Sequence, residues 1–201
     1  MGDPSMATTR ETYSPFTLTL HWVTAALVLT QPLLVWLSEE MSREDKSQWI
    51  GVHKSIGATL LILTLIRLSS RLAGNKAIPL PESTPDWQKL FARATHVLFY
   101  VLLIAMPLVG WAGSTAFGRE VVWFGLFQLP PLPFVPEDRE FGGSLMGLHK
   151  YAGYTLVTLV VLHILGGLTH YFVNKDNVLQ RMLPFLPRRD QAIEPARHEV
   201  V

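Results

Sequence analysis

The chain alternates between long apolar runs and short polar connectors. Four apolar runs cover residues 16–37, 49–72, 91–113 and 146–173. A helix needs about 20 residues to cross the hydrocarbon core of a bilayer, and each run is near or above that length. The pattern therefore predicts an all-α integral membrane four-helix bundle that occupies residues 16–173.

The remaining segments are expected to lie outside the hydrocarbon core. Residues 1–15 form a polar N-terminal segment, and residues 174–201 form a C-terminal tail in which His198 is given no role. The first apolar run is longer than a signal-peptide core and has no clear cleavage site after it, so we expect it to be retained. Residues 114–145 are aromatic and rich in proline, which favours an interfacial cap over the outer ends of the helices.

Composition narrows the setting further. Of the 201 residues, 49% are hydrophobic and only 16% are charged, which is too apolar for an ordinary small soluble domain. The net charge of +1 gives no indication of a nucleic-acid partner. Because the chain has no cysteine, it offers no disulfide, no thiolate metal site and no iron–sulfur ligand.

Lysine and arginine are unevenly divided between the two ends of the predicted helices. The end that carries both termini has 11 of the 17 basic residues, and the other end has six. The 11 are Arg10, Arg67, Arg71, Lys76, Lys89, Arg93, Lys175, Arg181, Arg188, Arg189 and Arg197. Because basic residues are enriched on the cytoplasmic side of membrane proteins, both termini are expected to be cytoplasmic.

One short motif occurs twice. GVHKSIGATL at 51–60 returns as GLHKYAGYTL at 147–156, and each copy has a glycine two residues before its histidine and another four residues after it. Such small residues let a flat macrocycle or a neighbouring helix approach the backbone, and plain helix packing is the alternative for any one of them. When the copies are aligned, Arg67 takes the place of His163.

Five histidines lie well within the predicted spans. They are His21, His53, His96, His149 and His163. An ionisable side chain at that depth is costly unless it is paired or used, so each is a functional candidate. Hydrogen bonding between helices is the alternative for any single one. A sixth, His170, lies at the cytoplasmic end of the fourth span.

The direction of the chain sorts these histidines by depth. His21 and His96 are near the starts of the first and third helices, which places them on the cytoplasmic half. His53 and His149 start the second and fourth helices on the outer half. The 14 residues from His149 to His163 amount to about 21 Å and nearly four turns, so one helix presents two histidines at two depths. The economical pairing joins His53 to His149 and His21 to His163, leaving His96 and His170 unassigned.

Two facing imidazoles at each depth favour haem over zinc. A zinc site needs about four ligands, and the spans offer no cysteine and essentially no Asp or Glu. Haem iron needs two axial ligands, and paired histidines on facing helices hold b-type haem in four-helix bundles. A proton relay is the other option, although it would normally include Asp or Glu within the spans. The pattern therefore predicts two haems b that conduct electrons between two depths.

Longer motifs resemble one family. LHW at 20–22, GVHKSIG followed by LIRLSSRL, THVLFYVLLIAMPLVGW at 95–111 and the segment from LHKYAGYTL to HYFVNKDNVLQRMLP at 148–184 are similar to the bacterial cytochrome b561 family of four-helix dihaem membrane proteins. The resemblance covers about residues 12–184. It implies two b haems with axial ligands from helices 1, 2 and 4, which here are His21, His53, His149 and His163.

The best understood type in this family implies a function. Superoxide oxidase takes electrons from superoxide at the outer face of the bacterial inner membrane and reduces ubiquinone within the membrane. The resemblance thus implies an oxidoreductase whose partners are superoxide, quinone and the lipid bilayer, with no obligatory protein partner.

The implied function predicts roles for charged and histidine residues besides the haem ligands. Cations at the outer mouth are expected to attract superoxide by electrostatic focusing. They are Lys54, Lys150 and Arg119. Groups near the cytoplasmic end are expected to bind quinone or carry protons to it. They are His96, His170 and Lys175. The alternatives are lysines that merely extend to the interface and histidines that anchor a helix.

Two other functions stay open at this point. A quinone-linked cytochrome b subunit of a periplasmic hydrogenase or formate dehydrogenase would use the same paired histidines. A non-redox membrane helper or transporter without haem belongs to a different class, and a colourless pure protein would identify it. The short outer connections, apart from the 114–145 cap, favour the superoxide oxidase reading over a docked subunit.

Overall fold

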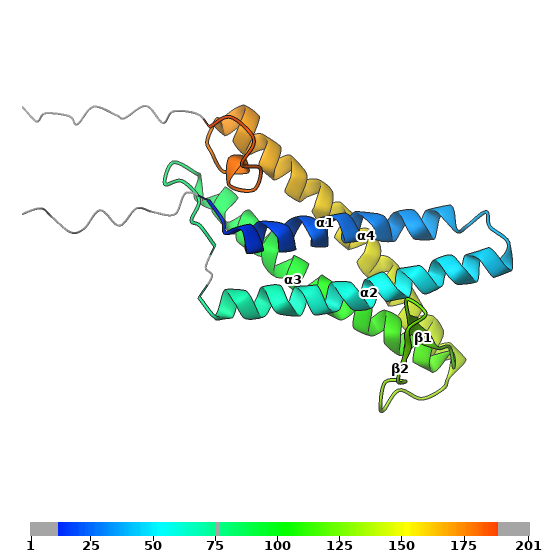
Figure 1. Ribbon diagram of the computed structural model, residues 1–201. Helices are drawn as coiled ribbons and strands as arrows, with labels where there is room; N and C mark the ends of the chain where they lie inside the picture. The colour runs from blue at the N-terminus through cyan, green and yellow to red at the C-terminus, as the bar shows by residue number, and fades with distance from the viewer. Residues whose placement is uncertain (1–11, 75–76, 189–201) are drawn as a thin grey trace, which may run out of the picture.

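The computed structural model describes residues 12–74 and 77–188, and four long helices form most of this part (Figure 1). They are α1 Pro15–Leu37, α2 Arg43–Leu72, α3 Asp86–Ala116 and α4 Arg139–Thr169. Each is long and apolar enough to cross a membrane, so the predicted all-α membrane four-helix bundle is confirmed. The rest of the expected N-terminal segment and C-terminal tail, with His198, lies outside the described residues.

Three helices begin several residues before the apolar runs that predicted them. α2 starts at Arg43 because Ser42 caps it, accepting a hydrogen bond from the backbone N–H of Asp45. In α4 the cap is Asp138, whose carboxylate accepts from the N–H of Phe141 at 2.7 Å. Acidic residues in these first turns also suit the helix dipole. The added turns are helical but polar, so they extend beyond the apolar part of each span.

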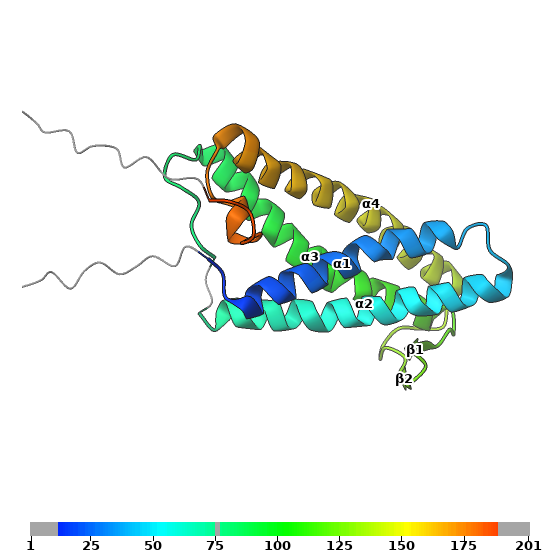
Figure 2. The same ribbon diagram turned by 45° about the horizontal axis from the view of Figure 1, so that its top comes forward.

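The helices pack in chain order. α1 contacts α2, α2 contacts α3, and α3 contacts α4. In both ribbon views the α3–α4 pair crosses the α1–α2 pair obliquely (Figures 1 and 2). We call the end of the bundle where α1 begins and α2 ends the tail side, and the opposite end, where α3 ends, the hairpin side.

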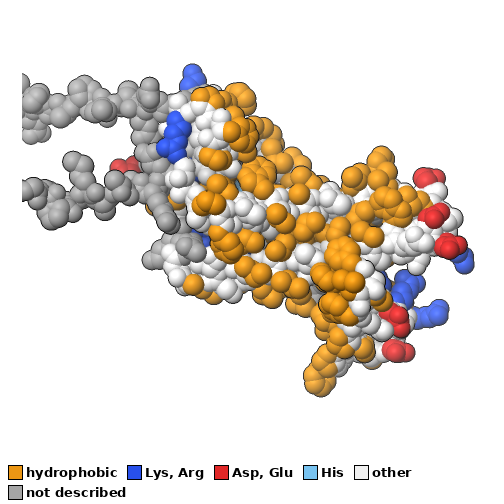
Figure 3. Space-filling model, in the orientation of Figure 1, with side chains coloured by type: hydrophobic (Ala, Val, Ile, Leu, Met, Phe, Trp, Pro, Cys, Tyr) orange, Lys and Arg blue, Asp and Glu red, His pale blue; other side chains and the backbone are white. Residues whose placement is uncertain are grey.

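Few apolar side chains are buried between the helices. The central cluster comprises Val28, Leu34, Ile56, Leu60 and Leu156. Most other large apolar side chains point outward and cover the length of the bundle, while charged side chains gather at its two ends (Figure 3). An apolar surface of this kind suits contact with lipid chains.

The segment expected to form a cap contains a small β-hairpin on the hairpin side. Strands β1 Val121–Trp123 and β2 Phe127–Leu129 pair antiparallel. The turn between them places both Phe124 (φ 46°) and Gly125 (φ 74°) in the left-handed region. This is the geometry of a type I′ turn, whose twist matches that of the strands.

Side chains of α2 hold this hairpin. Ser55 Oγ lies 3.1 Å from the carbonyl oxygen of Val122 and accepts a hydrogen bond from the N–H of Phe124 at 3.0 Å. Trp123 Nε1 donates to Thr59 Oγ1 at 3.1 Å. The cap is therefore fixed to the outer surface of one helix by side-chain hydrogen bonds.

The chain after α4 folds back onto the tail side. A π-helical turn, His170–Asn174, and a short 3₁₀ turn, Leu179–Arg181, follow α4. Trp22 Nε1 of α1 donates to the carbonyl oxygen of Met182 at 3.0 Å, and Arg181 Nη1 donates to that of Pro79 at 2.6 Å. The first part of the expected C-terminal tail thus packs against the bundle.

Candidate haem-binding sites

At the hairpin side, α2 and α4 bring two histidine rings together. The ring centroids of His53 and His149 are 6.0 Å apart, and the ring planes are 74° from parallel. Nδ1 of His149 lies 3.0 Å from the carbonyl oxygen of Met106 on α3. A hydrogen bond there keeps the proton on Nδ1 and leaves Nε2 unprotonated, as a metal ligand must be.

At the tail side, α1 and α4 form a second pair. The ring centroids of His21 and His163 are 6.3 Å apart, and their planes are 57° from parallel. His163 follows His149 by 14 residues on the continuous helix α4, a rise of about 21 Å. The structure thus brings together the two pairs expected from depth, and it separates them along the bundle.

Both pairs suit the two axial ligands of one iron. With metal–nitrogen bonds of about 2 Å, imidazoles on opposite sides of a metal have centroids about 6 Å apart. Among the described residues no three or more His, Cys, Asp or Glu side chains cluster as a metal site, so zinc coordination is not supported. Nδ1 of His53 is buried and has no hydrogen-bond partner among the described residues. The ligand set fits b-type haem.

A third imidazole lies at the tail-side level. The ring of His96 on α3 is 5.4 Å from that of His163, edge to face, and Phe99 contacts His163 at the same distance. The 5.4 Å spacing is closer than two ligands of one iron would stand. Nδ1 of His96 is also 2.6 Å from the carbonyl oxygen of Ala92, and its side chain is exposed. The spacing of His21 and His163 is nearer to that of two ligands of one iron, and the exposed side chain of His96 lies beside this pair.

The repeated glycines divide into two kinds. A Cβ added at Gly51 or Gly147, before each histidine, would meet nothing within 4 Å. A Cβ at Gly57 would come 3.5 Å from Gln31 of α1, and one at Gly153 would come 3.7 Å from a methionine of α3. The first glycine of each repeat borders open space, as the approach of a macrocycle requires, and the second packs against a neighbouring helix.

The π-helical turn builds a polar cluster at the tail side. His170 is buried, and its Nδ1 lies 2.6 Å from Oδ2 of Asp176. Asn174 donates to Gln88 of α3 at 3.1 Å, which joins the cluster to the neighbouring helix. Lys175 supplies the left-handed turn (φ 55°) of this loop, but its side chain is exposed.

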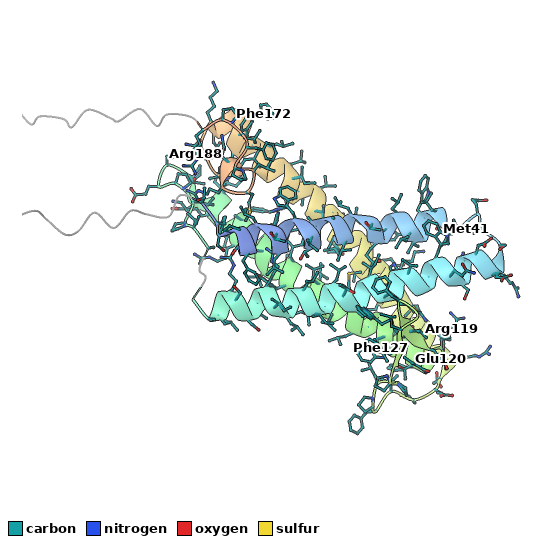
Figure 4. The ribbon with its side chains drawn as sticks, in the orientation of Figure 1. Met41, Arg119, Glu120, Phe127, Phe172 and Arg188 are labelled. Carbon is teal, nitrogen blue, oxygen red and sulfur yellow. The ribbon has the colours of Figure 1, made fainter. Side chains whose placement is uncertain are left out.

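The three expected outer cations make different contacts. Lys54 Nζ donates to the carbonyl oxygen of Glu120 at 2.9 Å, and Arg119 is close enough for its charge to act on Lys54. Figure 4 shows Arg119 and Glu120 together at the hairpin side. Lys150 instead lies 5.9 Å from the ring centre of the exposed Tyr154 on α4. Lys54 and Arg119 thus lie near each other, and Lys150 contacts a ring of its own helix.

The sequence comparisons agree with this arrangement. A sequence model of the prokaryotic cytochrome b561 family matches residues 12–185, nearly the whole chain. The chain belongs to the cytochrome b561 family. Because the four helices and the paired histidines all lie within the matched region, the likeness includes both candidate haem levels.

Named relatives cover nearly the same length. This cytochrome is 33% identical over 184 residues to cytochrome b561 homolog 2 of Escherichia coli (strain K12), which is 89% of this chain and 95% of that protein. It is 28% identical to a probable superoxide oxidase CybB of Yersinia pestis, over 86% of this chain and 96% of that one. It is 27% identical to cytochrome b562 of Cereibacter sphaeroides, over 85% and 94%.

Family membership settles the broad class of function. Cytochromes b561 are membrane electron-transfer proteins that bind haem b, so this chain is a multi-pass bacterial membrane protein with a redox role. The alternative of a non-redox helper or transporter without haem is not supported.

Some site residues were missing from the sequence prediction. Gln31 of α1 donates to the backbone carbonyl oxygen of His53 at 3.2 Å, and its buried Oε1 has no hydrogen-bond partner in the described part of the chain. Asp176, which pairs with His170, was counted only as part of a tail. A polar Gln inside an apolar span was a usable signal, because such residues commonly bond across helices. Nothing in the linear pattern indicated that Asp176 turns back toward the bundle.

Proposed function

We propose that this cytochrome is a superoxide oxidase, which transfers electrons from superoxide to ubiquinone through two haems b. The observation that carries the proposal is the pair of histidine levels, each with the spacing of two axial ligands. Two redox centres separated along α4 would give electrons a route from one side of the bundle to the other. The probable superoxide oxidase among the relatives supports this choice of substrates.

The chain's own part is to hold and orient the redox groups. His53 and His149 would ligate one haem iron, and His21 and His163 the other. When bound, each haem accepts and releases one electron as its iron changes between the ferric and ferrous states. The hydrogen bond from His149 to Met106 fixes the orientation of that ring before any ligand binds.

We place the hairpin side toward the periplasm and the tail side toward the cytoplasm of the bacterial inner membrane. The excess of basic residues at the tail side supports this orientation. Superoxide is an anion, and Lys54 with Arg119 would favour its approach at the hairpin side. Lys150 would add to the same field from the outer end of α4.

Quinone reduction needs protons as well as electrons. Two superoxide ions give up one electron each and become two molecules of oxygen, and ubiquinone takes both electrons with two protons to become ubiquinol. At the tail side, His170 with Asp176 and the exposed His96 would carry protons toward the quinone. Lys175 would stand at the cytoplasmic entrance, because its side chain is exposed on the same turn. No further protein subunit is required by this scheme.

Stopped-flow absorbance of the purified protein tests the proposal. Mixing with superoxide should reduce the b-type bands, and ubiquinone should reoxidise them. Added superoxide dismutase, as the control, should abolish the reduction. If superoxide does not reduce the b-type bands but a co-purified hydrogenase or formate dehydrogenase does, the result would support the dehydrogenase-subunit alternative instead.

A further inference from the structure

A membrane-embedded arginine lies at the level of the tail-side histidine pair. Arg67 follows His53 by 14 residues on α2, about 21 Å and nearly four turns, so it projects from almost the same face at the other depth. It is half-buried. The proposed electron route gives it no task.

The surroundings of Arg67 suit an anion. Its charge acts on both His21 and His163, and its guanidinium lies beside the hydroxyl of Tyr100 on α3. A crevice between α1 and α2 at this level is lined by two arginines, two hydroxyl side chains and one leucine. They are Arg67, Arg71, Thr17, Ser70 and Leu20. Guanidinium and hydroxyl groups are donors that carboxylates and phosphates bind.

No carboxylate of the described residues balances the charge of Arg67. The ion pairs in this part of the chain join Lys89 to Asp86 and His170 to Asp176. The sequence has no Asp or Glu from 46 to 81, from 87 to 119 or from 141 to 175. Because an arginine within a membrane is costly unless it is paired, the counter-ion should come from a bound group.

We propose that Arg67 binds a propionate carboxylate of the haem held by His21 and His163, and that it raises the reduction potential of that haem; this rests on the two-haem proposal above. Haem b carries two propionates, and a guanidinium pairs with a carboxylate through two parallel hydrogen bonds. Reduction adds a negative charge to the haem, and a nearby cation stabilises the reduced state. The potential of the tail-side haem would then favour electron flow from the hairpin side.

The same chemistry could be met by a lipid phosphate, so the test must separate the two sources. Redox titration of the b-type bands, with haem content measured in parallel, would compare wild type with Arg67→Gln and Arg67→Lys. Arg93→Gln is the matched control, because Arg93 is an exposed arginine at the tail side of α3. Each protein would be titrated in a phosphate-free detergent and again in phospholipid nanodiscs.

Arg67→Gln should keep both haems and shift the reduction equilibrium of one of them by about tenfold, or about 59 mV for a one-electron couple. The shift should occur in detergent as well as in nanodiscs. The potential of Arg67→Lys should lie between those of wild type and Arg67→Gln, and that of Arg93→Gln should be near wild type. Loss of the tail-side haem alone, restored in Arg67→Lys, would also support the proposal. Tyr100→Phe, which keeps the arginine, should give a smaller shift of the same sign.

Three results would overturn the assignment. Unchanged reduction potentials in Arg67→Gln, with both haems present, would rule out the contact between Arg67 and a propionate. A shift seen only in phospholipid would assign the counter-ion to lipid phosphate. Equal loss of both haems in Arg67→Gln, with unchanged potentials in Tyr100→Phe, would indicate a structural role. Failure of the two-haem proposal itself would show separately, as a wild-type titration with one component or none.

Discussion

The two histidine levels differ in how firmly the protein holds them. At the hairpin side, His149 is hydrogen-bonded to Met106, and its ring lies against Gly110, where an added Cβ would come 3.1 Å from Cε1. At the tail side, neither His21 nor His163 makes a side-chain hydrogen bond to another described residue. One ring of the hairpin-side pair is therefore oriented by fixed contacts, whereas both rings of the tail-side pair are held by ring contacts alone.

The tail-side level, whose rings have fewer fixed contacts, has more titratable and charged groups around it. Beside the tail-side pair lie His96 and Arg67, with the His170–Asp176 cluster at the same end of the bundle. Around the hairpin-side pair the neighbours are backbone carbonyls, glycines and the amide of Gln31, and the nearby charged group is Lys54. A centre that only passes electrons needs fixed ligands, whereas one that serves a proton-consuming acceptor needs titratable groups nearby. This contrast is why we place quinone reduction at the tail side.

The largest expected effect is the loss of one haem at a time. Replacing His149 or His53 with Ala should remove the hairpin-side haem and leave the other, because each iron would lose one of two axial ligands. Replacing His21 or His163 should do the reverse. The haem-to-protein ratio and the number of components in a redox titration measure this.

Two controls complete that experiment. His96→Ala should retain both haems, since the side chain of His96 is exposed and the proposed pairing gives His163 to His21. Equal loss of haem in all four ligand variants would contradict the separation into two levels. Loss of a haem in His96→Ala would mean that the tail-side ligand pair is misassigned.

Next in size is the effect of the tail-side carboxylate. Asp176→Asn keeps an oxygen that can accept from the Val178 N–H, as Oδ1 does at 3.0 Å, but removes the charge beside His170. Ubiquinol formation should fall roughly 10- to 100-fold, while superoxide still reduces both haems. The comparison of haem reduction with quinol formation in one stopped-flow series measures it. Asp86→Asn, an exposed carboxylate at the same end, is the control, and an equal fall there would point to surface charge.

The features that could be predicted from the sequence are those that depend on patterns along a whole helix. Four apolar runs gave the number of spans, and the 14-residue step on one helix gave two histidines at two depths. The contact of His96 with His163 was not predictable, because it depends on how α3 rotates against α4. The hairpin strands are only three residues long, and their turn uses a phenylalanine with positive φ, which carries no reliable signal. The return of Asp176 depends on a π-helical turn that an apolar run cannot indicate.

A smaller effect would test the rigidity of the hairpin-side level. Gly110→Ala places a methyl group 3.1 Å from the ring of His149, so the ring must move by a few tenths of an ångström. We expect the hairpin-side haem to be held less tightly by about 1 kcal/mol, roughly fivefold in its rate of transfer to apomyoglobin. Gly143→Ala, where a Cβ would meet nothing within 4 Å, is the control. An equal change at the tail-side haem would show that the two levels are not independent.

The smallest expected effect on the haems concerns the clamp between the hairpin and α2, which acts mainly on the stability of the fold. Ser55 is buried, and its hydroxyl accepts from the Phe124 N–H and lies within hydrogen-bonding distance of the Val122 carbonyl. Ser55→Ala leaves those backbone groups without this partner, so thermal unfolding should show a loss of about 1–3 kcal/mol. The exposed Ser47→Ala is the control. Ser55 follows His53 by two residues in the sequence. Any change in reduction potential caused by Ser55→Ala should therefore be confined to the hairpin-side haem. A changed reduction potential at the tail-side haem instead would mean that the hairpin affects the whole bundle. It would contradict the proposed difference between the hairpin-side and tail-side levels.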